Sequence, residues 1–330
     1  MTILTTKHTK HTKGIFGMRT SRRSFLSGLT ATAGLMVTSR AGANMPAPRP
    51  RHDPNLAVFI SDLHLNGLKE EVPTHLYEER CFCNAVGKIM ALDPLPAHVV
   101  CFGDIAYHWG QPEDYVLAAK LFQPLLDAGI KLTLGLGNHD RRDNFLVQWP
   151  SYAKSTLVPG RIVSKVEMPH VDLLMLDTIN AKPVEKMKGS HPGECSKEER
   201  EWLAETLKAA TKPVLTCSHH KPNEGKVGLD KLLHGSPACK GHIFGHWHRW
   251  FRDFLYVGWD PQKVFPISCL PSTGHWGDIG FVTFRTFPDR ATLTLHQDDF
   301  FFTGGPGDGQ SFRDDIVREK NGQTCTFRLA

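Results

Sequence analysis

The chain has 330 residues, enough for one large domain or two ordinary ones, with 40% hydrophobic residues, 22% charged residues and a formal net charge of +5. Residues 1–43 contain seven Lys or Arg and no Asp or Glu, so residues 44–330 carry a net charge of about −2. This balance gives no sign of a nucleic-acid-binding surface, which needs a basic stripe.

The first 43 residues have the pattern of a cleavable export signal. A basic segment precedes a moderately apolar run, which ends in the small residues Ala41-Gly42-Ala43. The paired Arg22 and Arg23 resemble a bacterial twin-arginine (Tat) signal. The alternative, a membrane anchor, is less favoured because the apolar run of residues 25–38 is short and rich in Gly, Ser and Thr. We therefore predict cleavage after Ala43, use of the Tat machinery, and a periplasmic or secreted location.

After this segment the chain alternates between apolar runs and helical patterns. Residues 44–55, rich in Pro and polar residues, predict a flexible lead-in to one domain, residues 56–330. Short apolar runs predict buried strands within residues 57–65, 98–107, 130–140, 171–180, 213–222 and 241–248. Helical patterns occupy about residues 75–92, 112–128 and 196–210. Strand-like runs without helices between them, which predict an antiparallel region, follow at residues 264–272, 279–287 and 290–299.

Eight cysteines all lie after residue 43. An export signal permits disulfides. However, Cys101, Cys217 and Cys269 lie inside apolar runs, where a free cysteine behaves as a small hydrophobic residue. Cys81 and Cys83 have no matching second pair, so a zinc ribbon is not indicated. The sequence assigns no disulfide pairing.

Polar side chains follow five of the first six apolar runs, within two or three residues of each run. They are Asp62, His64, Asp104, Asn138, His139, Asp140, His219, His220, His246 and His248. In α/β folds, ligands bind outside the carboxyl ends of the strands. We therefore expect these side chains to converge on one rim. His246 and His248 would point to opposite faces of a continuing strand, so a turn is required to bring both to this rim.

Two Asp, one Asn and four His of this set provide oxygen and nitrogen ligands without a thiolate. Such ligands suit Mn, Fe, Zn or Co. The set is larger than one tetrahedral zinc ion needs. Two metal ions that share a bridging carboxylate are the simplest interpretation, and such a pair suits phosphoryl transfer.

Five motifs, in order, resemble those of the calcineurin-like metallophosphoesterases. They are Asp62-Leu63-His64, Gly103-Asp104, Gly137-Asn138-His139-Asp140, His219 before Pro222, and Gly245-His246-Trp247-His248. The likeness covers most of residues 57–250, and the first motif is particularly similar to that of class III cyclic-nucleotide phosphodiesterases. The resemblance implies an α/β fold, a four-layer αββα sandwich of two mixed β-sheets.

The resemblance also implies two metal sites bridged by Asp104. The ligands of the first metal would be Asp62, His64 and His248. The ligands of the second metal would be Asn138, His219 and His246. His139 would stabilise the phosphoryl oxygens or protonate the leaving alkoxide, with Asp140 orienting it through a hydrogen bond. A metal-bridging hydroxide would attack phosphorus in line.

Tyr107 departs from the pattern of many family members. Three residues after the motif aspartate, it resembles the metal-binding tyrosine of purple acid phosphatases, but those enzymes lack the histidine found here at position 64. We therefore expect Tyr107 to lie outside the ligand set. The favoured function is a phosphodiesterase acting on a small phosphate ester, for which a nucleotide is one choice. An acid-phosphatase-like monoesterase and an inactive metal-binding scaffold remain alternatives.

Several other residues have two interpretations each. Arg141 and Arg142 are either phosphate contacts or solvated helix residues, and Asp177 is predicted to be structural. His220 is expected to have a structural or pocket role, and the segment at 271–280 either brings His275 near the substrate or simply connects strands. Loop or surface positions are predicted for His108, His191, His234 and His242.

Overall fold

The computed structural model describes residues 51–68, 78–180, 193–256, 264–275, 277–298 and 320–330. These residues belong to one compact unit, Arg49–Ala330. The predicted export signal, residues 1–43, and His191 lie outside the described residues. Within the described ranges, no helix combines the length and the apolar character that a membrane span requires.

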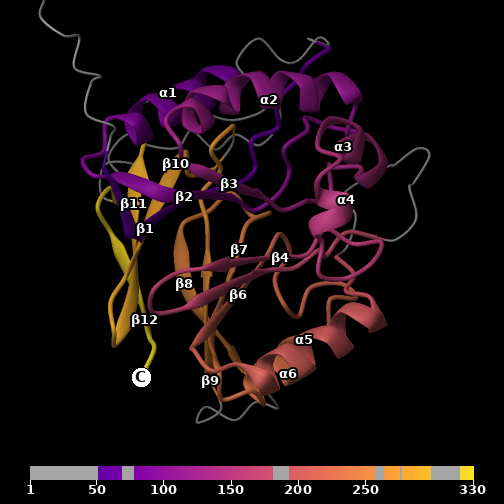
Figure 1. The fold of residues 1–330 in the computed structure, drawn as a ribbon, viewed down its shortest axis with the longest axis vertical. Helices are drawn as coiled ribbons and strands as arrows, with labels where there is room; N and C mark the ends of the chain where they lie inside the picture. Colours follow the sequence, from indigo (N-terminus) through magenta and orange to yellow (C-terminus); the bar gives the residue numbers. More distant parts are fainter. Residues whose placement is uncertain (1–50, 69–77, 181–192, 257–263, 276, 299–319) are drawn as a thin grey trace, which may run out of the picture. The chain divides into compact units, whose positions relative to one another are not determined.

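Two six-stranded mixed sheets form the centre of this unit (Figure 1). The first sheet contains, in spatial order, β12 (Thr324–Arg328), β11 (Arg290–Gln297), β10 (Gly280–Thr286), β1 (His52–Ile60), β2 (Leu95–Cys101) and β3 (Lys131–Leu134). The second sheet contains β4 (Ser164–Glu167), β5 (Asp172–Met175), β6 (Val214–Ser218), β7 (Cys239–Phe244), β9 (Val264–Cys269) and β8 (Phe251–Tyr256).

The described helices are α1 (Glu78–Met90), α2 (Pro112–Asp127), α3 (Arg142–Gln148), α4 (Tyr152–Ser155), α5 (Lys197–Ala209) and α6 (Asp230–His234). The predicted start of α5 is confirmed, because the side chain of Ser196 accepts a hydrogen bond from the backbone N–H of Glu199 at 3.2 Å. Helix α2 begins with Pro112, a residue that suits the first helical turn because its missing N–H would have no partner there.

Three apolar clusters define the layers. Val58 and Ile60 pack with residues of α1 and α2, whereas the alternating residues Ala57 and Phe59 pack against β5, β6 and β7 of the other sheet. A third cluster joins the far side of the second sheet to Leu203 and other residues of α5 and α6. Figure 1 shows α1 and α2 on one side of the sheets and α5 and α6 on the other. The four-layer αββα sandwich is confirmed.

Parallel pairing aligns the strands that precede the polar motifs. Strands β1, β2 and β3 are parallel neighbours in the first sheet, and β5, β6 and β7 are parallel neighbours in the second. The predicted antiparallel region is confirmed for β10 and β11. It holds in part for β9, which pairs antiparallel with β8 and in parallel with β7 through residues 267–269.

The first strand begins earlier than the lead-in prediction allows. The lead-in was expected to continue to residue 55, but β1 starts at His52. His52 and Asp53 pair with Leu95 and Pro96 of β2. Pro54 lies inside this strand, within the register shift between Asp53 and Ala57, so its missing N–H falls outside the paired residues.

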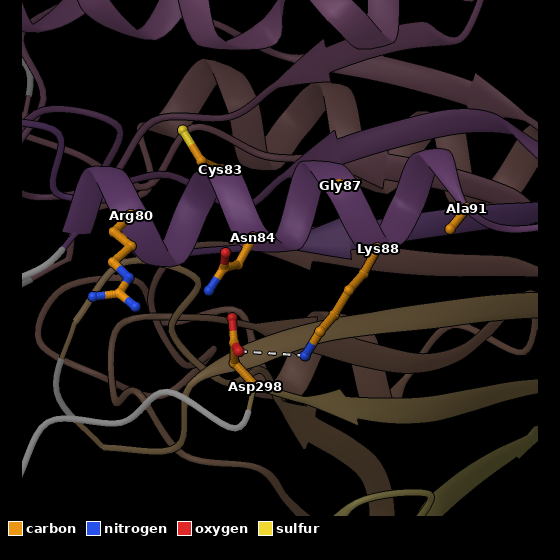
Figure 2. A pocket seen from close by; sticks show the side chains of 7 residues that line it. All are labelled: Arg80, Cys83, Asn84, Gly87, Lys88, Ala91 and Asp298. Atoms are coloured by element: carbon orange, nitrogen blue, oxygen red, sulfur yellow. Dashed lines mark hydrogen bonds and ion pairs between the residues drawn. The ribbon is translucent and has the colours of Figure 1, made fainter. Parts of the chain in front are cut away.

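All eight cysteines are free, and only Cys83 is exposed. Cys83 projects from α1 beside an open groove, where Nζ of Lys88 lies 3.3 Å from Oδ1 of Asp298 (Figure 2). Burial raises the pKa of Cys81 and of Cys195 to about 12. The expectation of buried, unpaired cysteines is confirmed for Cys101, Cys217 and Cys269.

One thiol of the native protein should therefore react rapidly with a thiol-specific aromatic disulfide at pH 8. The reactive species is the thiolate, which needs both ionisation and access, and only Cys83 has access. The measurement is a stopped-flow thiol titration of the native and the urea-unfolded protein. Cys83→Ser should abolish the rapid phase, and rapid reaction of several thiols would contradict the structure.

Candidate metal centre

The loops after five strands bring the predicted site residues to one rim. Asp62 and His64 follow β1, Asp104 follows β2, and residues 138–140 follow β3. His219 follows β6, while His246 and His248 follow β7. The site therefore draws on both sheets, at the carboxyl ends of their parallel strands.

Five of these residues have left-handed backbone conformations. Their φ angles are 55° for Asp62, 48° for His64, 50° for Asp104, 69° for His246 and 53° for His248. Residues other than glycine rarely adopt this region, at a cost on the order of 1–3 kcal/mol each. At His246 and His248 the left-handed conformation turns the chain sharply after β7, which confirms the predicted strand-end turn.

The first group of potential ligands is Asp62, His64 and His248. Nε2 of His248 lies 3.2 Å from Oδ1 of Asp62, and Nε2 of His64 lies 3.2 Å from Nε2 of His248. One ligand atom from each of the three lies within 4.8 Å of the other two. Asp62 and His64 are buried, so a metal ion here would be largely shielded from solvent.

The second group lies on the other side of Asp104. Nε2 of His219 lies 2.9 Å from Oδ1 of Asn138 and 3.2 Å from Oδ2 of Asp104. The ring centroids of His219 and His246 are 5.0 Å apart. These contacts bring Asn138, His219 and His246 together, as the sequence predicts.

Asp104 lies between the two groups. Its Oδ2 atom is 3.7 Å from Nε2 of His64 as well as 3.2 Å from Nε2 of His219. The other carboxylate oxygen of Asp104, Oδ1, accepts a hydrogen bond from the backbone N–H of His139 at 2.8 Å. The side chain is buried, so its carboxylate is aimed at both groups rather than at water.

Backbone carbonyls orient three of the imidazoles. Nδ1 of His64 donates to the carbonyl of Tyr107 at 3.2 Å, and Nδ1 of His219 donates to that of Phe102 at 3.0 Å. Nδ1 of His248 donates to the carbonyl of His275 at 2.8 Å. Each ring therefore directs its Nε2 toward the site, the nitrogen through which it would bind a metal.

The family model for calcineurin-like phosphoesterases matches residues 57–250, more than half of the chain and every predicted ligand. The chain belongs to this family. A relative named "Probable cyclic nucleotide phosphodiesterase", from Psychrobacter arcticus, is 27% identical over 169 residues, which cover 49% of this chain and 57% of the relative. The match thus spans little more than half of that relative.

Solved structures share the fold of this phosphoesterase. A dimetal phosphatase from Danio rerio has a TM-score of 0.55 at 16% identity, over 74% of this chain and 96% of that one. The structure of PhoD has a TM-score of 0.53 at 11% identity, over 86% of this chain and 71% of that one. At these identities the likeness supports the fold.

Charges in the phosphoesterase site suit metal ligands. Burial alone would raise the pKa of Asp62, but His248 beside it lowers that pKa to about 2. Burial would also raise the pKa of Asp104, yet His219 and His139 hold it well below its usual range. Burial lowers the pKa of His64 to about 3. Anionic carboxylates and a neutral imidazole are the forms that bind a metal.

A further observation indicates that these side chains are suited to hold metal ions. Nε2 of His220 is buried and has no hydrogen-bond partner among the described residues, while its Nδ1 lies 2.9 Å from the hydroxyl of Thr178. His220 groups with His219 and His246 within 4.8 Å. A buried polar atom without a partner is costly in a protein alone, so it indicates a site completed by a bound group.

The structure corrects the role predicted for Asp140. Its carboxylate accepts hydrogen bonds from the backbone N–H groups of Ile105, Ala106 and Gly137, at 2.9–3.2 Å. His139 instead donates from Nδ1 to the carbonyl of His108 at 3.2 Å. Asp140 therefore joins the loops after β2 and β3, because it follows a turn that aims its side chain at backbone amides rather than at the neighbouring imidazole.

The structure also corrects the predictions for Arg142 and His242. Arg142 is neither a phosphate contact nor a solvated residue, because it donates two hydrogen bonds, at 2.6 and 2.7 Å, to the fully buried Asp177. The structural role predicted for Asp177 is confirmed. His242 is not at the surface: it is buried between the hydroxyls of Thr216 and Ser218.

Tyr107 contacts the site through its backbone. Its carbonyl orients His64, and its ring centroid lies 6.2 Å from that of His275. The ring centroid of His275 lies 4.5 Å from that of His64, so the segment after β9 does reach the site. Sequence reasoning missed Glu224, whose Oε1 lies 3.1 Å from Nε2 of His246.

Gly137→Ala should impair the site without removing a ligand. A Cβ atom at this position would lie 2.3 Å from Oδ1 and 2.5 Å from the backbone nitrogen of Asp104. We expect a loss of about 1–3 kcal/mol in stability from overpacking, together with weaker metal binding. Urea unfolding and metal titration measure the two effects. Gly87→Ala, where the added Cβ meets nothing within 4 Å, is the control.

Proposed function

We propose that this phosphoesterase is an exported binuclear-metal phosphodiesterase that hydrolyses a small phosphate ester, a nucleotide being one such ester. The observation that carries the proposal is the buried Asp104 carboxylate between two groups of ligands. The similarity to a relative named as a cyclic nucleotide phosphodiesterase supports the choice of a diester. Mn, Fe, Zn and Co all suit these oxygen and nitrogen donors.

The residues around the centre have distinct roles in this proposal. Asp62, His64 and His248 would hold one metal, Asn138, His219 and His246 would hold the other, and Asp104 would contribute to both sites. Such a pair of metals would supply activation of a water molecule and stabilisation of the charge on the attacking and leaving oxygens. His139, whose Nδ1 is engaged by the carbonyl of His108, contacts a phosphoryl oxygen or protonates the leaving oxygen through Nε2.

The test combines metal content with hydrolysis of bis-p-nitrophenyl phosphate and p-nitrophenyl phosphate. About two metals per chain, turnover that chelators abolish, and a faster rate with the diester are expected. His139→Ala should lose turnover and retain both metals. Faster hydrolysis of the monoester would favour the acid-phosphatase-like alternative, which Tyr107 first suggested.

A metal-binding scaffold is the alternative of a different class. It predicts that the wild-type protein binds metal but hydrolyses neither ester after loading with Mn, Fe, Zn or Co. The presence of His139 beside the two ligand groups favours the enzyme over this alternative, because a scaffold has no use for a proton donor there.

Export is proposed from the sequence of residues 1–43. The double substitution Arg22→Lys, Arg23→Lys should hold the protein in the cytoplasm, because the paired arginines are the recognised feature. Cell fractionation with an antibody to the folded domain measures the distribution. An unchanged periplasmic or secreted fraction would contradict use of the Tat machinery.

A further inference from the structure

Glu224 contacts the one predicted histidine ligand that is held differently from the others. Oε1 of Glu224 lies 3.1 Å from Nε2 of His246. In His64, His219 and His248, a backbone carbonyl engages Nδ1 and leaves Nε2 for the site. In His246 the carboxylate engages Nε2, which leaves Nδ1 for a metal.

The backbone around Glu224 fixes its side chain. Oε2 accepts a hydrogen bond from the backbone N–H of Lys221 at 3.3 Å, and the N–H of Glu224 donates to the carbonyl of Lys221 at 3.0 Å. The carbonyl of Glu224 accepts from the N–H of Val227 at 3.0 Å. With Oε2 held by the turn, Oε1 has a defined direction toward His246.

Partial burial makes this contact effective. The side chain of Glu224 is 24% exposed and that of His246 is 16% exposed, so water screens the pair less than a surface ion pair. A carboxylate on one ring nitrogen selects the tautomer with the proton at that nitrogen and makes the other nitrogen a better metal ligand.

We propose that Glu224 is a positioning residue for the second metal: it holds the proton of His246 on Nε2 and so directs Nδ1 to the metal. The proposal rests on the binuclear centre of the proposed function, but not on turnover. Without the carboxylate, the imidazole rotates and exchanges tautomers, so the affinity of the second metal falls while the first site, formed by Asp62, His64 and His248, is unaffected.

The experiment measures metal affinity in the full chain. The metal-free wild type and the variants Glu224→Ala, Glu224→Gln and Glu205→Ala are titrated with Zn²⁺ in competition with a chromogenic chelator. Glu205 is an exposed residue of α5 and controls for the loss of one negative charge. For Glu224→Ala, the affinity of the weaker of two sites should fall by about 10–100-fold. Glu224→Gln should retain most of it, because the amide oxygen accepts the same N–H.

Each other outcome has a separate meaning. Equal affinities for Glu224→Ala and wild type would overturn the positioning role and leave the proposed function intact. A loss in Glu224→Gln as large as in Glu224→Ala would also overturn it, since it would indicate a carboxylate bound directly to the metal. Fewer than two metals in the wild type would contradict the proposed function instead.

A second measurement needs no variant of Glu224. In the ¹⁵N spectrum of the zinc-loaded wild type, the His246 ring should have a protonated Nε2 and a zinc-bound Nδ1, whereas His64, His219 and His248 should show the reverse. The His246 signals are assigned by their absence from His246→Asn. A zinc-bound Nε2 in His246 would overturn the proposal even if Glu224→Ala fails to fold.

Discussion

Replacing Asp104 with asparagine should lower phosphate-ester hydrolysis by at least about 10³-fold and reduce the metal content below two ions per chain. The carboxylate lies 3.7 Å from Nε2 of His64 and 3.2 Å from Nε2 of His219, so both groups of ligands share it. Asparagine keeps the shape but removes the charge. Loss of a metal costs several kcal/mol of transition-state stabilisation, and each 1.36 kcal/mol is about tenfold in rate.

Metal analysis and steady-state kinetics with bis-p-nitrophenyl phosphate measure the two effects of Asp104→Asn. Asp143→Asn is the matched control, because Asp143 is exposed and pairs with Arg141 outside the metal centre. A variant at position 104 that keeps two metals and the wild-type rate would contradict the bridging role. Partial activity with one metal retained would locate the chemistry at a single site.

Replacing Arg142 with alanine should destabilise the protein by about 3–5 kcal/mol, because it leaves the buried carboxylate of Asp177 without its cation. Asp177 is fully buried and also accepts a hydrogen bond from the backbone N–H of Ile162 at 2.8 Å. Arg142 additionally donates to the carbonyls of Ile179 and Asn180, so its loss removes contacts to three residues of the loop after β5 at once.

Urea unfolding of the metal-free protein gives this free energy, and Arg141→Ala provides the comparison. Arg141 and its partner Asp143 are 38% and 53% exposed, so that pair contributes at most about 1 kcal/mol. Equal stabilities of the two alanine variants would contradict the structural role. A raised KM with unchanged stability in Arg142→Ala would instead restore the phosphate-contact interpretation.

Much of the fold and of the site could be predicted from the order of the motifs. Apolar runs that end in Asp, Asn or His predict strands and their carboxyl ends, and parallel pairing of β1, β2 and β3 necessarily places residues 62, 104 and 138 together. The strands β6 and β7 do the same for His219 and His246. Recognising each strand from its apolar pattern is enough to predict that the residues at these strand ends lie together.

Contacts between loops could not be predicted in the same way. Asp140 was assigned to the imidazole next to it in sequence, whereas its partners are the amides of residues 105 and 106 on another loop. Glu224 lies in a turn with no periodic signal, and its contact with His246 depends on how two loops meet. His242 was misplaced because one buried histidine between two hydroxyls has no sequence signature.

The left-handed backbone at the ligands has a consequence for how this sequence can change over generations. Glycine adopts that conformation with less strain than aspartate or histidine, because it has no Cβ atom. At Asp62, His64, His246 and His248, the replacements that relax the backbone are therefore replacements that delete a proposed metal ligand. Drift toward a more stable fold and retention of the metal centre act in opposite directions here. Inactive descendants of this chain should accordingly be well folded, with glycine where the ligands once stood.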